Sequence, residues 1–339
     1  MQENGLYKIA QLEPNGLKAV DLFCGVGIGA YGIKKAGYDI IFGIDNSVNA
    51  IKTYNANIGD HGICGDIRKL KSSDIPQHDL MIATPVCKPC SVCGARRLTD
   101  DEKYGDLLAE TIRLFSECKP KALFFENVKG LVLEKSKPIF LEFVHRLESY
   151  GYYVYWSVEN CLDYGVPQER ERVFLVAIRT DIPNEFVKPQ KLLFGKKSQR
   201  DAFYDLKDKT IEDVKNHNTD YVVHHNDTFV VKNRQRGWDL PSNTVISEMN
   251  SVPYYPEPLL PSLKYITDGP RRLSVRESLR LQTVGDDFYF PDDIPLSVQY
   301  ERCSGIPSLV SYKYGIAIAD CLLGKTPLRK DTKKLKKLF

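Results

Sequence analysis

The stretch DLFCGVGIG, residues 21 to 29, ends an apolar run and precedes a helical pattern that extends to about Gly37. The apolar run, Leu17 to Phe23, has the composition of a buried strand. Because glycine has no side chain, such a turn lets the backbone approach a ligand, and the helix start offers free N–H donors. Glycines in this pattern can also serve tight packing alone. Their place between a strand and a helix favours a nucleotide or nucleoside site.

Two acidic residues follow this turn at informative positions. Asp45, sixteen residues after Gly29, closes a second apolar run, 40–44, where a carboxylate can accept hydrogen bonds from ribose hydroxyls. Asp66 stands in the next loop, where it could hold an adenine amino group. The glycine spacing differs from the dinucleotide pattern Gly-x-Gly-x-x-Gly, which favours an adenosine-type ligand without a bridging pyrophosphate. S-adenosylmethionine fits that description.

The first half of the chain alternates short aliphatic runs with stretches of helical periodicity. This alternation is typical of an α/β fold with a doubly wound, mostly parallel sheet and crossover helices. The further expected strands are 80–83, 122–125, 154–158 and 173–178, and the further expected helices are one ending at 57 and those at 106–118, 138–150, 274–281 and 311–323.

The composition of the chain changes after Arg179: the sequence becomes polar, and its apolar residues follow no regular period. The 339 residues are enough for two domains. A composition of 42% hydrophobic and 27% charged residues excludes a disordered or low-complexity chain. The expected parts are a cofactor-binding and catalytic domain at 1–182, a small domain at 183–267, a segment at 268–324 that returns to the first domain, and a basic tail at 325–339.

The net charge of +3 hides an uneven distribution. The tail from Lys325 to Phe339 has seven basic residues and one acid, so it carries +6 and the rest of the chain −3. Such a tail is either a solvated end or an accessory contact for phosphate groups. Nine cysteines at scattered spacings favour a reducing compartment, which we take as the cytoplasm, and no apolar run is long enough for a membrane span.

The loop after the run at 80–83 contains three cysteines, Cys87, Cys90 and Cys93, in the sequence TPVCKPCSVC. Ligands bind at the carboxyl ends of strands in such sheets, which would place these thiols beside the cofactor. The spacing resembles part of a zinc or iron–sulfur ligand set, but a fourth ligand at matching spacing is missing. We favour the alternative, a single nucleophilic thiol without a metal, whose thiolate the adjacent Lys88 could stabilise.

Polar side chains also stand at the ends of later apolar runs. Glu126 follows the run at 122–125, where an acid is costly unless it is ion-paired or used in catalysis. Gln168, Arg170 and Arg172 alternate ahead of another apolar run, so they share one face of an extended segment. That row can hold a carbonyl or phosphate group; a surface ladder of salt bridges with the intervening glutamates is the alternative.

Taken in order, these segments resemble the DNA cytosine-5 methyltransferase family over most of the chain. Seven ordered matches are far more specific than any single one. They are DLFCGVGIG at 21–29, TPVCKPCS at 84–91, ENV at 126–128, DYGVPQERER at 163–172, WDLPSNTV at 238–245, RLSVRE through LQ at 272–282 and GIP at 305–307. The resemblance implies a Rossmann-like, S-adenosylmethionine-dependent methyltransferase sheet with a small, irregular target-recognition domain.

The resemblance also implies a mechanism with assigned residues. The target cytosine would be flipped out of the duplex, and the Cys87 thiolate would add to C6 of its ring, making C5 nucleophilic. Glu126 would hydrogen-bond or protonate N3, and Arg170 would contact the base. Arg172 and Gln168 would organise the site. After the methyl group reaches C5, loss of the C5 proton and elimination of Cys87 would release 5-methylcytosine.

The implied partner is double-stranded DNA, and the enzyme is expected to be a monomer beside which a cognate restriction endonuclease can act separately. The residues expected to bind S-adenosylmethionine are Phe23, Gly25, Gly27, Asp45, Asp66 and Leu107, and those expected to contact DNA are Gln168, Lys232, Arg234 and Arg236.

The chain departs from the family pattern at two places. Lys88 stands where the family has Gln after the catalytic Cys, and Cys303 and Ser304 replace the Gly and Asn of the last motif. These departures leave open a catalytically silent protein that binds cofactor and DNA, or a cytosine enzyme whose donor carries a carboxylated group on the sulfonium. Methylation of tRNA is disfavoured, because that branch has a Cys-Phe-Thr element and no cysteine occurs here between Cys161 and Cys303.

Overall fold

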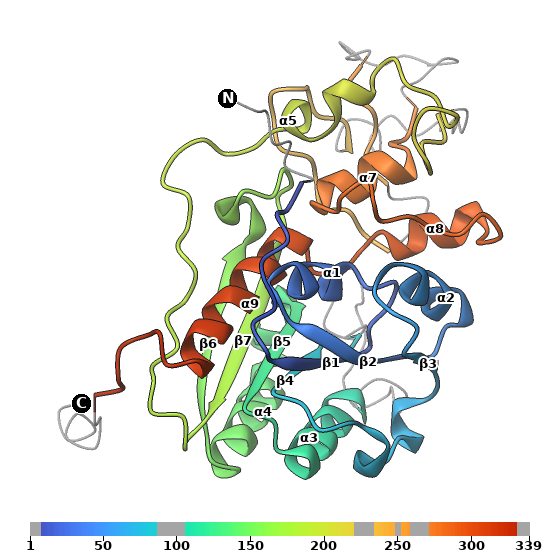
Figure 1. Cartoon of the computed structure of the whole chain (residues 1–339). Helices are drawn as coiled ribbons and strands as arrows, with labels where there is room; N and C mark the ends of the chain where they lie inside the picture. The colour runs from blue at the N-terminus through green and yellow to red at the C-terminus, as the bar shows by residue number, and fades with distance from the viewer. Residues whose placement is uncertain (1–7, 87–105, 220–233, 248–251, 258–270, 331–339) are drawn as a thin grey trace.

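In this computed structural model, the residues described are 8–86, 106–219, 234–247, 252–257 and 271–330 (Figure 1). They contain a seven-stranded sheet in the order β3-β2-β1-β4-β5-β7-β6. The strands are β1 (Lys18–Leu22), β2 (Asp39–Asp45), β3 (Gly62–Cys64), β4 (Leu80–Ala83), β5 (Ala122–Val128), β6 (Tyr152–Asn160) and β7 (Glu171–Arg179).

Strands β1 to β5 are parallel, which confirms the predicted α/β fold with a doubly wound, mostly parallel sheet. Strand β7 is antiparallel to both β5 and β6. The predicted strands 154–158 and 173–178 lengthen to nine residues each, because they pair with each other along their whole length. The sequence does not predict β3, since three residues are too few to show a pattern of apolar side chains.

Helices cover both faces of the sheet (Figure 1). Phe124 of β5 packs into the apolar cluster on the side of α1 and α9, and Phe125 packs into the cluster on the side of α3 and α4. No described helix is long and apolar enough to cross a membrane. The helices are α1 (Ile28–Lys35), α2 (Val48–Asn57), α3 (Asp106–Cys118), α4 (Lys137–Ser149), α5 (Gln199–Phe203), α7 (Val275–Leu281), α8 (Leu296–Arg302) and α9 (Ser308–Leu322), with short 3₁₀ turns at Ile67–Lys69, Ser72–Asp74, Lys129–Val132, Cys161–Tyr164 and Tyr204–Leu206.

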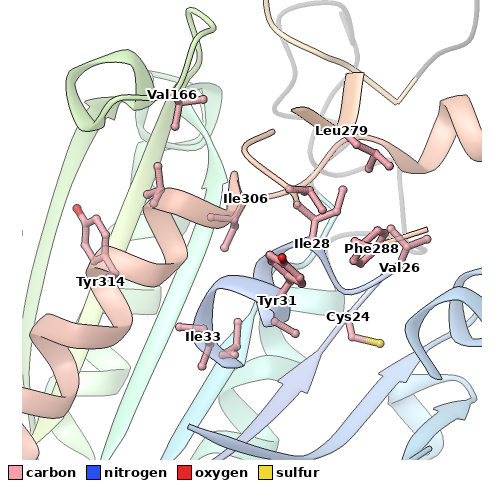
Figure 2. Packing of buried hydrophobic residues seen from close by; sticks show 14 of the residues in the cluster. Cys24, Val26, Ile28, Tyr31, Ile33, Val166, Leu279, Phe288, Ile306 and Tyr314 are labelled. Atoms are coloured by element: carbon pink, nitrogen blue, oxygen red, sulfur yellow. The ribbon is translucent and has the colours of Figure 1, made fainter. Parts of the chain in front are cut away.

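Helix α9 returns from the end of the chain to pack against α1. The hydroxyl of Ser308 donates a hydrogen bond to the carbonyl of Ile28 at 2.8 Å. A β-carbon at Gly32 would lie 2.1 Å from the carbonyl oxygen of Ser308, so only glycine fits where the two helices cross. Figure 2 shows Ile28 and Ile306 within the apolar cluster beside this crossing. The last segment therefore supports the turn at residues 21–29.

A second group of elements, α5, α7 and α8, lies above the sheet in Figure 1. At its apolar centre, the ring of Trp238 lies 5.4 Å from that of Phe203 and 5.2 Å from that of Tyr255. Arg280 of α7 donates a hydrogen bond to the carbonyl of Ala202 in α5 at 3.5 Å and forms an ion pair at 2.6 Å with Asp205, in the 3₁₀ turn that follows α5. Helix α7 therefore packs against α5, which lies within the expected small domain.

The segment that leads from β7 to the small domain is fastened to the outer strand β6. The Glu159 side chain is 2% exposed and pairs with Lys188 at 2.6 Å and with Lys191 at 2.5 Å. Burial alone raises the pKa of this carboxyl group, but the two lysines outweigh burial and hold the pKa at about 2. The start of the small domain thus has a charged anchor on the sheet.

Of the basic tail, residues 325–330 are described. Arg329 lies over the ring of Tyr153 at 3.5 Å and donates hydrogen bonds to the carbonyls of Asn184 at 2.9 Å and Ile182 at 3.4 Å. This residue therefore docks on the outer strand of the sheet and is not part of a solvated end. Residues 331–339 lie outside the described residues.

Replacing Gly32 with alanine should destabilise the fold, because the added methyl group must displace the backbone of Ser308. Overpacking of this kind costs about 1–3 kcal/mol. Gly29→Ala in the same helix is the matched control, since a β-carbon there would meet Ile306 at an ordinary 3.7 Å. Thermal unfolding of the two variants tests the crossing; equal melting temperatures would contradict it.

The free energy of unfolding should depend on pH through Glu159. Because the folded pKa of about 2 lies below the ordinary value of 4.5, the stabilisation is present above pH 4.5 and is lost as the pH falls toward 2. The two lysines are 45% and 42% exposed, so solvent screens the pair and we expect only about 1 kcal/mol. In urea, Glu159→Gln should unfold more easily than the wild type at pH 6, and the difference should shrink by pH 3. A difference of constant size would show that the charge of Glu159 is not responsible.

Candidate active site

Four strands bring their carboxyl ends to one edge of the sheet. Leu22, the last residue of β1, is paired with Ile44 of β2 and Ala83 of β4, and Ala83 is paired with Phe125 of β5. Ligands bind at this edge in open α/β sheets. The residues that directly follow these positions, and therefore emerge side by side, are Phe23, Asp45, Thr84 and Glu126.

The glycine turn closes on Asp45. The N–H of Gly25 donates to Oδ2 of Asp45 at 3.1 Å, and the N–H of Ser47 donates to Oδ1 at 3.0 Å. Gly25 has a φ of +53°, and a β-carbon there would meet no atom of the described residues within 4 Å. Gly27 has a φ of +92°, but a β-carbon there would lie 2.6 Å from Cγ1 of Ile58. Gly25 thus borders open space, whereas Gly27 is required for packing, the alternative reason for glycine in this turn.

Charges of both signs meet at Asp45. Burial and the charge of Asp45 raise the pKa of Asp21 well above its usual range. Arg302, at the end of α8, brings Nη1 to 3.9 Å from Oδ1 of Asp45. The guanidinium group therefore offsets part of the negative charge of Asp45.

The other residues predicted to hold a nucleoside already make contacts within the protein. Asp66 accepts hydrogen bonds from Nε of Arg68 at 2.9 Å and from Nη2 at 2.6 Å, and this pairing lowers the pKa of Asp66 to about 2. An adenine amino group would have to share the carboxylate with Arg68. Phe23, with a φ of +61°, and Leu107 both pack against the apolar cluster on the side of α3 and α4.

Glu126 stands at the other end of this edge, with its side chain 10% exposed and its Oε1 3.2 Å from Nε of Arg172. That oxygen accepts no hydrogen bond from the described part of the chain, so the contact is an ion pair without hydrogen-bond geometry. The neighbouring Asn127 donates to the carbonyl of Pro85 at 3.0 Å. The first residues of the loop that leads to Cys87 are thus held against the strand of Glu126.

Arg170 is buried beside this acid. Its Nη1 donates to the carbonyl of Val245 at 2.9 Å, while its Nε has no acceptor among the described residues. Burial and then the charge of Arg172 lower the pKa of Arg170, and the charge of Glu126 acts in the opposite sense. A buried guanidinium N–H without an acceptor is unusual in a folded protein. It suits an oxygen atom that a substrate brings into the site.

Gln168 is fully buried, and both ends of its amide are used inside the protein. Its Nε2 donates to the carbonyl of Leu281 at 2.7 Å and to Oε1 of Gln282 at 3.1 Å, and its Oε1 accepts from the N–H of Val245 at 3.2 Å. The assignment of Gln168 as a DNA contact therefore does not fit this geometry, because no polar atom of the side chain reaches the surface. Its expected part in organising the site stays a prediction.

The predicted alternation along residues 168–172 is confirmed, since the glutamates Glu169 and Glu171 are exposed while their even-numbered neighbours point inward. Glu169 pairs with Arg236 at 2.9 Å, and Glu171 pairs with Lys129 at 3.0 Å. Salt bridges thus form on the outer face, with partners from other segments. The inner face is left for the site.

This arrangement can be compared with known proteins. A family model described as C-5 cytosine-specific DNA methylase matches residues 17–306. The chain belongs to this family. The match confirms the family prediction made from the motifs, and with it the prediction that the protein is a DNA cytosine-C5 methyltransferase.

Relatives of this methylase are similar over most of their length. The chain is 30% identical to the Type II methyltransferase M.FnuDI of Fusobacterium nucleatum, over 95% of this chain and 100% of that protein. It is 34% identical to the Type II methyltransferase M.MthTI of Methanothermobacter thermautotrophicus, over 79% of this chain and 86% of that one. The structure of the Entamoeba histolytica methyltransferase EhMeth has a TM-score of 0.69 at 16% identity, covering 93% of this chain and 99% of that one. This structural likeness supports the fold.

Several residues predicted for the methylase site lie outside the described residues, namely Cys87, its neighbour Lys88, and Lys232. Of the other predicted DNA contacts, Arg236 is ion-paired as described above, and the backbone carbonyl of Arg234 accepts from the N–H of Tyr254 at 3.2 Å. Within the described ranges, no group of His, Cys, Asp and Glu side chains could hold a metal ion.

The structure adds three residues that sequence reasoning missed. Val245 contributes only its backbone, which a pattern of side chains cannot reveal. Asn127 lies inside the recognised ENV motif, so its polarity beside a buried acid was an available signal. Arg302 directly precedes the last motif, whose Gly305 would place a β-carbon 3.5 Å from Ile28. That motif packs on the glycine turn. Arg302, which adjoins the motif in the sequence, therefore also lies beside this turn.

Proposed function

We propose that the chain transfers a methyl group from S-adenosylmethionine to C5 of a cytosine flipped out of duplex DNA. The observation that carries this proposal is that one sheet edge holds both the Gly25–Asp45 turn and two buried groups of opposite charge, Glu126, which is ion-paired with Arg172, and Arg170. The turn suits a nucleoside cofactor, and the pair suits a polar base. The Type II methyltransferases among the relatives support a role in restriction and modification.

The residues of the turn fit S-adenosylmethionine. No atom of the described residues lies within 4 Å of a β-carbon placed at Gly25, and a carboxylate has lone pairs beyond those that Asp45 uses for backbone N–H groups, so Asp45 can accept from ribose hydroxyls. We assign the adenine amino group to Asp66 and apolar contact to Phe23 and Leu107. Gly27 acts by keeping the turn packed on α2. When bound, the cofactor supplies a methyl group activated by a sulfonium.

At the other end of the site, we assign Cys87 as the nucleophile whose thiolate adds to C6 and makes C5 nucleophilic. Oε1 of Glu126, which accepts no hydrogen bond from the described residues, is suited to share a proton with N3 of the ring. The Nε–H of Arg170 would donate to the carbonyl oxygen of the base, and Arg172 would hold Glu126 in place. Once C5 carries the methyl group, loss of its proton lets the Cys87 sulfur leave and restores the aromatic ring.

For the duplex, we propose Lys232, Arg234 and Arg236 as contacts to phosphate groups or base edges. We expect a monomer, because the residues assigned to catalysis and cofactor all belong to one chain. We expect it in the cytoplasm, the reducing compartment that the scattered cysteines favour. A restriction endonuclease would then act as a separate protein.

Transfer of labelled methyl groups to duplex DNA tests the activity. The wild type should label DNA, and sequencing after bisulfite treatment should identify the target site. Cys87→Ala should lower the transfer rate at least about a thousandfold, since it removes the nucleophile. Glu126→Gln should lower it about 10²- to 10⁴-fold, the range for general acid–base groups. Cys118→Ala, a change at the end of α3, is the control and should keep the wild-type rate.

Other outcomes of the same assay would overturn the proposal. Label on tRNA alone would contradict the DNA substrate. Duplex binding without any transfer would indicate a silent recognition protein. A product heavier than 5-methylcytosine, formed from a mixture of donors, would indicate a carboxylated donor instead.

Gly25→Ala should weaken binding of S-adenosylmethionine, because its methyl group would enter the open space assigned to the cofactor. Gly16→Ala is the matched control: Gly16 also has a positive φ, +79°, and no atom within 4 Å of a β-carbon, but it lies before β1. Both variants should lose about 1 kcal/mol of folding stability from backbone strain. Calorimetry should show a dissociation constant raised roughly tenfold for Gly25→Ala alone, or about 1.4 kcal/mol. Equal affinity in both variants would contradict the assignment of the turn.

A further inference from the structure

We infer that Gln168 is a positioning residue, which fixes Arg170 by holding the backbone of Val245 against the segment that precedes β7. This inference rests on the proposed function, because that function gives Arg170 its contact with the target base. It implies that residues 242–245, which belong to the expected recognition domain, affect the rate of methyl transfer.

Val245 is held at both sides of its backbone. Its N–H donates to Oε1 of Gln168 at 3.2 Å, and its carbonyl accepts from Nη1 of Arg170 at 2.9 Å. Gln168 and Arg170 are two residues apart in an extended segment, so they lie on the same face. The amide thus sets the place of Val245, and the Val245 carbonyl sets the place of the guanidinium group.

Further hydrogen bonds align the same two segments. The N–H of Ser242 donates to the carbonyl of Pro167 at 2.9 Å, and the N–H of Glu169 donates to the carbonyl of Ser242 at 2.9 Å. The hydroxyl of Thr244 donates to the carbonyl of Glu169. Residues 242–245 therefore lie alongside the residues that precede β7, and Ser242 forms an isolated parallel bridge with Gln168.

The other end of the Gln168 amide is anchored in the opposite direction. It donates to the carbonyl of Leu281 and to Oε1 of Gln282, and Gln282 in turn donates to the carbonyl of Cys303 at 2.9 Å. Both glutamines are fully buried. Neither side chain can rotate without leaving buried polar groups unpaired, which is costly, so the anchor is rigid.

Arg170 depends on this anchor because its own contacts are few. Its side chain is long and buried, and its Nε has no acceptor among the described residues. Without the carbonyl of Val245 at the observed place, the guanidinium group would turn away from the position assigned to the base. A displacement of about 1 Å in a catalytic site can lower the rate roughly a hundredfold.

Gln168→Met tests the inference, because methionine keeps the length of the side chain and removes both ends of the amide. Gln299→Met is the matched control: Gln299 is also buried and its amide also donates to a carbonyl, that of Ile294 at 2.8 Å, but it lies on α8 without a bond to Val245. In single turnover on duplex DNA, Gln168→Met should transfer methyl groups roughly a hundredfold more slowly than Gln299→Met. The dissociation constant for S-adenosylmethionine should differ by less than about threefold between the two variants.

The same substitution in an Arg170→Lys background separates positioning from general damage. If Gln168 acts through Arg170, Gln168→Met should cost little further rate there, because residues that act as a unit are not additive. An equal loss of rate in both backgrounds would overturn the inference, and so would equal rates for Gln168→Met and Gln299→Met at similar melting temperatures.

Hydrogen exchange gives a readout that does not depend on activity. The amide of Val245 should exchange faster in Gln168→Met than in the wild type or in Gln299→Met. Protection of that amide in a wild type that labels no DNA would refute the proposed function while leaving the hold on Val245 intact. Unchanged exchange in an active wild type and in Gln168→Met would refute the positioning role alone.

Discussion

The site depends on the direction of β7. In its antiparallel pairing with β5, Arg172 lies opposite Val128 and Phe174 lies opposite Glu126. Strand β7 therefore begins at the sheet edge where β1, β2 and β4 end, and the residues just before it arrive beside Glu126. A parallel strand of nine residues would have carried Arg170 and Arg172 to the opposite edge, roughly 30 Å away. The meeting of acid and guanidinium groups is thus a consequence of one reversed strand.

The same reversal explains how the small domain is attached to the site. The turn before β7 is free to pair with residues 242–245 because it stands ahead of the sheet and is not part of it. Two buried glutamines then connect this turn to the last motif, which packs on the glycine turn. Groups assigned to the base and groups assigned to the cofactor are therefore supported by one continuous set of buried contacts. The residues expected to recognise DNA and the residues assigned to catalysis are thus held by the same buried contacts.

Sequence reasoning found the elements and motifs, because strands buried on both faces read as apolar runs and the glycine turn has a distinctive composition. It could not find the reversed direction of β7, since an apolar run carries no sign of direction. It could not separate Gly25 from Gly27, because the difference lies in Ile58, thirty-one residues beyond Gly27. Alternation correctly placed Gln168 on the inner face. It could not show that the amide of Gln168 would form hydrogen bonds with backbone groups of other segments.

The small net charge acquires a structural meaning from the ion pairs. Arg236 and Lys129 are each held by an exposed glutamate next to the site, and Arg329 is docked on the outer strand. An exposed pair contributes only about 0–1 kcal/mol, so a DNA phosphate can replace Glu169 at Arg236 with little loss. The freed glutamate then lies near the phosphate and repels it, which limits the gain. Affinity for a duplex should therefore depend less on pairs of this kind than on the buried groups that we propose receive the base.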